Sequence, residues 1–179
     1  MLFRSEGAFR ETLLSLSVEE KTGYRLDPCT CGSLLDTYNR VRLEHFDFFP
    51  GVAPLLRQLR KQHKLVLITN GHPYSQRPKV ERVRFAEYVD HVLLGGELPH
   101  EKPHPWIYEE ALRLAGCEKS RALHVGDRLD SDILGANRSG IRSVWVSHGQ
   151  PQDPHVAIPD GVIEDFVELP ALLEKIAPV

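Results

Sequence analysis

The order of apolar and polar positions divides the chain into two regions that meet near Pro50 and Gly51. Before this point, apolar residues recur three or four positions apart, which is the spacing of one helix face. They form two groups, Phe9, Leu13 and Leu16, then Leu34, Tyr38 and Val41, with Pro28 and Gly32 interrupting the pattern between them. We therefore expect residues 1–49 to form a small helical region of two amphipathic helices.

After residue 50, short apolar runs alternate with stretches of helical spacing. Runs at 65–68, 92–94, 122–125 and 143–146 have the length and composition of buried parallel strands, and an edge strand is expected at 162–166. Helical spacing covers 52–59, 80–83, 107–114, 131–139 and 169–176, and Gly116 and Gly140 suit helix C-caps. This alternation predicts an α/β domain over 50–179, with a Rossmann-like, doubly wound parallel sheet.

Composition narrows the class of protein. The 179 residues are 41% hydrophobic and 26% charged, as in one ordinary globular domain. A formal charge of -3 gives no general reason to expect nucleic acid or an anionic membrane as partner, and no apolar stretch approaches the about 20 residues of a membrane span. The odd number of cysteines favours a reducing compartment, so we expect a cytoplasmic protein. Cys29 and Cys31 lack nearby zinc-ligand partners and are expected in a loop.

Polar residues follow the first two predicted strands of the sheet. Thr69, Asn70 and Gly71 end the first strand, where a hydroxyl and backbone N–H groups suit a phosphate oxygen, although an ordinary Asn-Gly turn also accounts for them. Lys102 lies after the second strand, next to Pro103, which helps to start a helix. A lysine at this edge of the sheet offsets the charge of a phosphoryl group, whereas most lysines are simply solvated.

Three carboxylates follow the third predicted strand, at Asp127, Asp130 and Asp132. Oxygen ligands of this kind suit Mg²⁺, which binds through one or two carboxylates and keeps several waters. Helix N-capping by Asp130 or Ser131 is the alternative, and it accounts for Asp130. Capping does not account for Asp127, which precedes the helix.

As a set, these motifs resemble the second, third and fourth motifs of the haloacid dehalogenase superfamily of hydrolases, in the same order and at matching spacing. The resemblance covers about residues 48 to 150 and includes the run at 133–141. Within the superfamily, the sequence is similar to the N-acylneuraminate-9-phosphatase-like phosphatases through residues 75–77, 95–97 and 168–173.

The resemblance implies a magnesium-dependent phosphatase that acts on a small phosphorylated metabolite through an aspartyl-phosphate intermediate. Lys102 and Thr69 would be catalytic, and Thr69, Asn70, Gly71 and Lys102 would bind the phosphate. Asp127 would help to bind Mg²⁺, and Asp132 would support that site directly or through a metal-bound water. The helical region 1–49 would be a cap that sets substrate choice.

The family's first motif, an apolar strand that ends in Asp-x-Asp-x-Thr and carries the nucleophile, is absent from the sequence. Asp27 and Asp36 do not follow apolar strands, whereas residues 2–10 resemble what normally comes after the motif. In the family this strand lies in the centre of the sheet. We therefore expect it to be encoded upstream, and residues 1–179 alone to be inactive and poorly stable.

Two other classes of protein share some of these residues. A receiver domain also uses Asp, Thr and Lys-Pro at strand ends, but its acidic residues precede the other two, whereas Asp127 follows them here. A phosphate-binding module that has lost its nucleophile remains an alternative. Basic side chains follow the phosphate-binding turn at His72, Arg77 and Lys79. They would either contact an acidic substrate or form the solvated first turn of a helix. The pattern specifies neither the substrate nor the oligomeric state.

Overall fold

A computed structural model describes residues 17–176, and the predicted helix around Phe9, Leu13 and Leu16 lies outside that range. The chain divides into two compact units, Met1–Phe46 and Asp47–Val179, whereas the sequence placed the division at 49/50. In the first unit, residues 17–22 are helical and α2 spans Pro28–Glu44.

Helix α2 begins earlier than its apolar pattern indicates. Pro28 occupies the first helical position, the Asp27 side chain accepts the N–H of Thr30, and Gly32 lies inside the helix. Pro28 and Gly32 therefore do not interrupt the helical region as expected, because a proline is well tolerated in a first turn. Cys29 and Cys31 consequently lie in a helical turn and not in a loop.

The second unit alternates strands with helices. Its strands are β1 (Val66–Thr69), β2 (His91–Leu94), β3 (Leu123–Gly126), β4 (Arg142–Val146) and β5 (Gly161–Ile163). Its longer helices are α3 (Val52–Leu59), α4 (Pro73–Arg82), α5 (Pro105–Ala115), α6 (Leu134–Ser139) and α7 (Leu169–Ile176), with short helical turns η1 (Phe85–Glu87), η2 (Gly95–Glu97), η3 (Lys119–Arg121), η4 (Leu129–Ile133) and η5 (Phe166–Glu168). Four predicted strands agree with the structure to within one residue at each end. The predicted edge strand at 162–166 is shorter, because Asp165 caps the turn η5.

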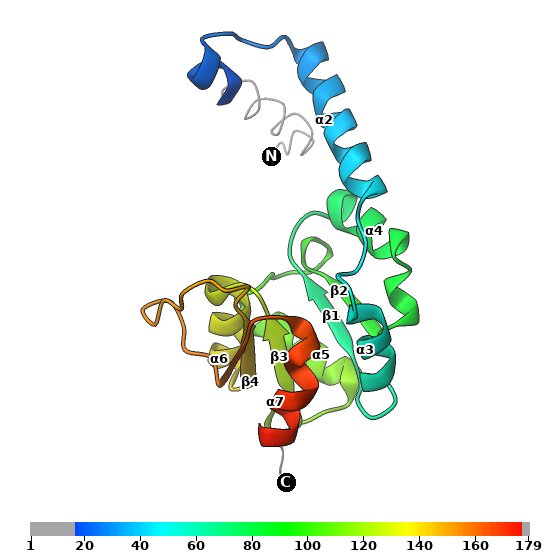
Figure 1. The fold of residues 1–179 in the computed structure, drawn as a ribbon, viewed down its shortest axis with the longest axis vertical. Helices are drawn as coiled ribbons and strands as arrows, with labels where there is room; N and C mark the ends of the chain where they lie inside the picture. The colour runs from blue at the N-terminus through cyan, green and yellow to red at the C-terminus, as the bar shows by residue number, and fades with distance from the viewer. Residues whose placement is uncertain (1–16, 177–179) are drawn as a thin grey trace. The chain divides into compact units, whose positions relative to one another are not determined.

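All strand pairs are parallel, and helices pack on both faces (Figure 1). On one face, Ile107 and Tyr108 of α5 pack with Leu93 and Ala136. On the other face, residues of β4, β5 and α7 form a second cluster, Val144, Val146, Ile163 and Leu169. This arrangement is the predicted doubly wound architecture.

Within the described residues, the strands form two sheets and not one. Strand β1 pairs only with β2, and β3 pairs only with β4, which in turn pairs with β5. Strands β1 and β3 each therefore leave one edge without a strand partner in residues 17–176. An unpaired edge presents a row of backbone donors and acceptors to whatever lies beside it.

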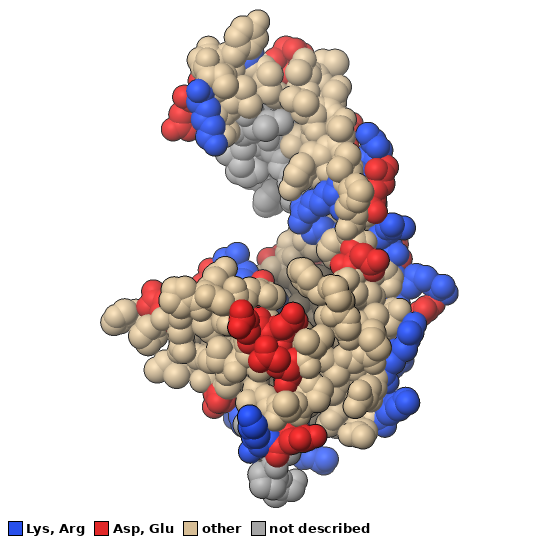
Figure 2. All heavy atoms as spheres, viewed as in Figure 1, with Lys and Arg blue, Asp and Glu red and all other residues tan. Residues whose placement is uncertain are grey.

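The surface shown in Figure 2 carries both signs of charge. Acidic side chains gather in front of the second unit, and basic side chains lie along the side formed by α3 and α4. In the part of the chain that the structure describes, no helix is long and apolar enough to cross a membrane.

A close contact between α5 and α6 fixes the segment that follows β3. The single proton of the Tyr108 hydroxyl is shared between the carbonyl oxygens of Ser131 and Asp132, which lie 2.9 and 3.0 Å away in the π-helical turn η4. A Cβ atom on buried Gly135 would overlap the ring and hydroxyl of Tyr108. Only glycine therefore lets α6 approach α5 this closely.

We expect Gly135→Ala to lower the free energy of unfolding by about 1–3 kcal/mol, because the added methyl overpacks against Tyr108. Alanine otherwise favours a helix over glycine by up to about 1 kcal/mol, so destabilisation identifies the packing effect. Chemical denaturation measures the change. Exposed Arg138 lies in the same helix, and Arg138→Ala should stay within about 0.5 kcal/mol. If Gly135→Ala were as stable as the parent, the close approach of α6 to α5 would be contradicted.

Candidate active site

The three polar motifs meet at one cavity, at the carboxyl ends of β1 and β3. Thr69 ends β1, Asp127 directly follows β3, and Lys102 lies in the loop between η2 and α5. The cavity has a volume of about 500 Å³ and is lined by Thr69, Asn70, Lys102, Pro103, Asp127, Arg128, Asp130, Ser131 and Asp132. Five of the six predicted site residues therefore line one cavity. Gly71 does not, and its N–H points toward Glu101 Oε1 at 3.4 Å.

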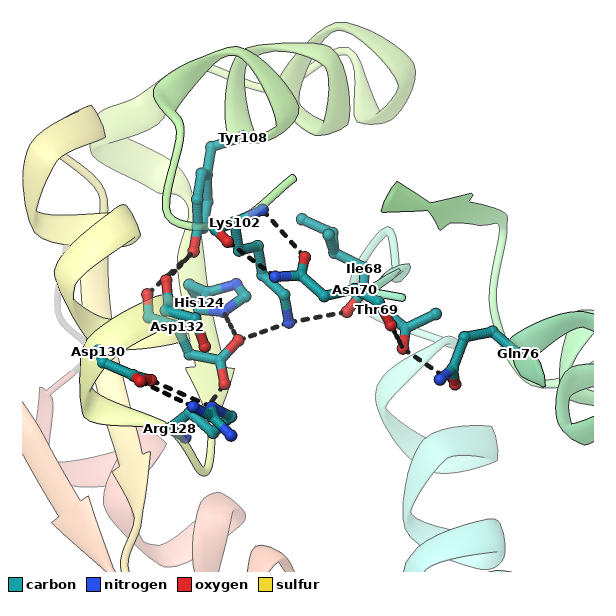
Figure 3. A network of polar contacts seen from close by, with 11 residues as sticks. Ile68, Thr69, Asn70, Gln76, Lys102, Tyr108, His124, Arg128, Asp130 and Asp132 are labelled. Carbon is teal, nitrogen blue, oxygen red and sulfur yellow. Dashed lines mark hydrogen bonds and ion pairs between the residues drawn. The ribbon is translucent and has the colours of Figure 1, made fainter. Parts of the chain in front are cut away.

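The Lys102 side chain is held from two sides. Its Nζ atom donates to Asp132 Oδ1 at 2.6 Å and to the Ile68 carbonyl oxygen at 3.1 Å (Figure 3). Only 10% of the lysine side chain and 4% of the aspartate side chain are exposed. An ammonium group has three N–H donors, so one remains beyond these two bonds. The lysine lines the cavity, which makes that donor and the positive charge available to an anion there.

Asp132 accepts hydrogen bonds on both carboxylate oxygens. Oδ1 is shared by Lys102 Nζ and by His124 Nε2, which lies 3.2 Å away, and Oδ2 accepts the Arg128 N–H at 3.1 Å. Burial disfavours the charged carboxylate, but the hydrogen bond from His124 and the charge of Lys102 outweigh it and hold the pKa of Asp132 well below its usual range. The carboxylate is therefore ionised and fully engaged by protein donors.

Asn70 joins the loop after β1 to the Lys102 loop. Its side-chain Nδ2 donates to the Lys102 carbonyl oxygen at 2.7 Å, and its Oδ1 accepts the Lys102 N–H at 2.9 Å. Among residues 17–176, the Thr69 hydroxyl makes only long contacts, 3.3 Å to the Asn70 carbonyl oxygen and 3.5 Å to Gln76 Oε1. The amide of Asn70 thus anchors Lys102, and the hydroxyl of Thr69 is the less firmly held of the two groups.

The two outer carboxylates differ in their surroundings. The main-chain carbonyl of Asp127 accepts the Trp145 indole N–H at 2.9 Å. Its exposed carboxylate accepts no hydrogen bond from the described residues. Asp130 pairs with the Arg128 guanidinium through two bonds, at 3.1 and 2.7 Å. The capping role expected for Asp130 is wrong, because η4 has no side-chain cap and the arginine competes for the carboxylate.

No group of three or more His, Cys, Asp or Glu residues within residues 17–176 is arranged to hold a metal ion by itself. The open carboxylate of Asp127 nevertheless fits a Mg²⁺ site, because this ion keeps several waters and needs only one or two protein carboxylates.

Two residues of this network were not predicted. His124 lies inside β3 and Tyr108 inside α5, and their rings make an edge-to-face contact with centroids 5.0 Å apart. Both lie in apolar runs, where a residue with a polar atom needs a buried partner. A residue with a polar atom inside an apolar run was the sequence signal that could have identified both. The partner of each lies in η4, which the spacing of residues along the sequence does not indicate.

Known proteins are similar in sequence to most of this chain. Human N-acylneuraminate-9-phosphatase is 35% identical over 141 residues, which are 78% of this chain and 57% of the human protein. Glyceraldehyde 3-phosphate phosphatase from Methanopyrus kandleri is 33% identical over 145 residues, covering 80% of this chain and 62% of that protein. The chain thus spans about three-fifths of the length of these relatives.

Solved structures have the same fold. A 2-haloacid dehalogenase from Pseudomonas syringae pv. Tomato matches with a TM-score of 0.69 and 32% identity, covering 96% of this chain and 72% of that one. The HAD-hydrolase YfnB from Bacillus subtilis, whose structure is bound to magnesium, matches with a TM-score of 0.79 and 22% identity, over 95% of this chain and 73% of that one. The model of the haloacid dehalogenase-like hydrolase family matches residues 5–146. The chain therefore belongs to the haloacid dehalogenase-like hydrolase family.

Proposed function

We propose that this chain forms the greater part of a magnesium-dependent phosphatase that hydrolyses a small phosphomonoester. The observation that supports it best is Lys102, a buried lysine that Asp132 and the Ile68 carbonyl hold at the edge of the cavity. Preorganised positive charge in a partly dry site is an effective way to stabilise charge on a transferring phosphoryl group. The relatives named above as phosphatases support the same class of reaction.

In this proposal, the residues in and beside the cavity have different roles in binding a phosphate. The Thr69 hydroxyl is weakly engaged and donates to one phosphate oxygen, while Lys102 offsets charge on another. Asn70 contributes chiefly by fixing the Lys102 backbone, because both ends of its amide are already bonded there. Gly71 contributes its small size and its φ of 103°, which lets the turn after β1 form.

We assign direct contact with Mg²⁺ to Asp127 and an indirect role to Asp132. The Asp127 carboxylate lines the cavity without a hydrogen-bonding partner in the described chain, whereas both oxygens of Asp132 are occupied by protein donors. When bound, the ion would polarise the phosphoryl group and offset its charge. Asp132 would act through Lys102 and through water.

The nucleophile is proposed to be an aspartate on a strand that pairs with the edges of β1 and β3 that have no strand partner among residues 17–176. An aspartate at the carboxyl end of such a strand would reach the same cavity, because the carboxyl ends of parallel strands meet at one edge of a sheet. The aspartate would attack phosphorus, the bond from phosphorus to the leaving alkoxide would break, and water would then hydrolyse the acyl phosphate.

The substrate is proposed to be a small phosphorylated metabolite. The two relatives described above are named for N-acylneuraminate 9-phosphate and glyceraldehyde 3-phosphate, which share a phosphate ester on a small molecule. The region 1–49 is proposed to be the cap that selects among such molecules. The three cysteines are free thiols, which suits a reducing compartment such as the cytoplasm.

A phosphate-binding module is the second candidate, and the absence of Asp-x-Asp-x-Thr from the sequence is the observation that favours it. Such a module would use Thr69 and Lys102 to bind phosphate without turning it over. The two candidates differ in whether an in-frame nucleophile exists.

We expect the reading frame upstream of Met1 to encode an apolar run of about five residues, a usual strand length, followed by Asp-x-Asp-x-Thr or a close variant. Sequencing that region, and assaying the extended protein for magnesium-dependent release of phosphate from phosphomonoesters, tests the proposal. An unrelated sequence or a stop codon there would instead support the binding module, provided that residues 1–179 fold cooperatively and bind phosphate without hydrolysing it.

In the protein that contains its nucleophile, Asp127→Asn should reduce magnesium-dependent turnover by about 100-fold or more, since it weakens a charged ligand of the ion. The thermal midpoint should change little, because the carboxylate is exposed and accepts no hydrogen bond from the described chain. Asp130→Asn is the matched control, because the exposed Asp130 carboxylate pairs with Arg128 and such surface pairs contribute little to stability. Equal turnover of Asp127→Asn and parent at saturating magnesium would exclude the metal role.

Lys102→Met should lower kcat by at least about 100-fold, because methionine keeps the apolar stem but removes the charge aimed at the phosphoryl group. Steady-state kinetics separates kcat from KM. Lys64→Met serves as the control, since Lys64 is exposed and pairs with Asp90 outside the cavity. An effect confined to KM would mean that Lys102 binds the substrate equally in the ground and transition states.

A further inference from the structure

His124 is a polar residue within an otherwise apolar strand. Its neighbours Leu123 and Val125 pack into the cluster formed by β4, β5 and α7. Because side chains alternate along a strand, His124 points to the opposite face, where it meets the ring of Tyr108. Only 13% of its side chain is exposed, and it is not among the residues that line the cavity.

The hydrogen bond between His124 and Asp132 has a defined direction. Asp132 Oδ1 forms an ion pair with Lys102 Nζ at 2.6 Å, and a carboxylate in an ion pair only accepts hydrogen bonds. The proton between the two atoms, 3.2 Å apart, therefore belongs to Nε2 of His124. The imidazole is a donor that the proposed phosphatase reaction does not otherwise use.

This donor acts on the oxygen that holds Lys102. Oδ2 of Asp132 is fixed by the Arg128 N–H, whereas Oδ1 is fixed by His124 and Lys102 together. The terminal torsion of an aspartate has broad minima, so a carboxylate with one anchored oxygen can still rotate. The His124 bond supplies the second fixed anchor, and Figure 3 shows the resulting line of contacts from the imidazole through the carboxylate to the lysine.

We propose that His124 is a positioning residue, whose Nε2–H holds Asp132 Oδ1 so that the carboxylate keeps Lys102 Nζ aimed into the phosphate cavity. The proposal rests on the proposed function, because it assumes that Lys102 meets a phosphate there. His124 itself touches neither phosphate nor metal in this arrangement.

Three substitutions separate the donor from the packing of the ring. His124→Gln places an amide donor near the position of Nε2, His124→Met has similar length without a donor, and His124→Asn has the amide but stops short of Asp132. Each variant is made in the chain extended through the proposed upstream strand and is titrated with inorganic phosphate at fixed magnesium. We expect the dissociation constant to stay within about threefold for Gln and to rise about tenfold for Met and Asn, in line with the loss of one hydrogen bond to a charged group.

A second readout follows Lys102 directly and does not depend on phosphate. The ¹⁵N-detected signal of its ammonium group, assigned by its disappearance in Lys102→Arg, should exchange slowly with water in the parent and in Gln. Exchange should be several-fold faster in Met and Asn. If one of these two variants fails to fold, the other still provides the comparison with Gln.

Two outcomes would overturn the proposal. In one, His124→Gln, His124→Met and His124→Asn all match the parent in phosphate affinity and Lys102 exchange. In the other, all three are equally impaired, which would show that only the packing of the ring matters. If the parent itself binds no phosphate, the proposed function fails, while the Lys102 exchange rates still decide whether His124 positions the lysine.

Discussion

The buried ion pair between Lys102 and Asp132 is the interaction on which the rest of the site depends. Removing both charges from water costs several kcal/mol per ion, and their attraction offsets this only when further hydrogen bonds satisfy the remaining donors and acceptors. The surrounding groups meet that requirement: the Ile68 carbonyl accepts from the lysine, and His124 and the Arg128 N–H donate to the aspartate. Removing any of them leaves part of a buried charge without a partner, so the position of each is constrained.

The same pair joins two parts of the core that share no strand pairing in the described chain. Lys102 bonds to Ile68 in β1 and to Asp132 in η4, directly behind β3, and Asn70 fixes the backbone of the lysine. The polar groups at the carboxyl ends of β1 and β3 are therefore held at one cavity by side chains. A doubly wound sheet brings these ends together, and the network converts that proximity into a defined geometry.

The sequence predicted the elements well and their long-range contacts poorly. Helices α3 and α7 have the predicted bounds, since apolar spacing records which residues face a core. The sequence predicted a phosphate-binding role for Asn70 but not the hydrogen bond from its side-chain amide to the Lys102 backbone, 32 positions away. Tyr108 reaches Ser131 across 23 positions. Contacts at such separations follow from tertiary packing, and local periodicity contains no information about them.

The energetics of the pair also bear on whether the site serves catalysis or simple binding. A buried ion pair is weak support for stability, because apolar residues of similar volume often stabilise a core equally well. Stability alone therefore does not explain Lys102 and Asp132 in this position. Binding a phosphate needs positive charge and donors, and a flexible exposed lysine supplies both. A lysine that is fixed at both its backbone and its ammonium group is most effective at stabilising charge that develops during a reaction. Its donors then need no rearrangement at that moment. The rigidity of Lys102 is thus the feature of the described chain that favours an enzyme over a binding module.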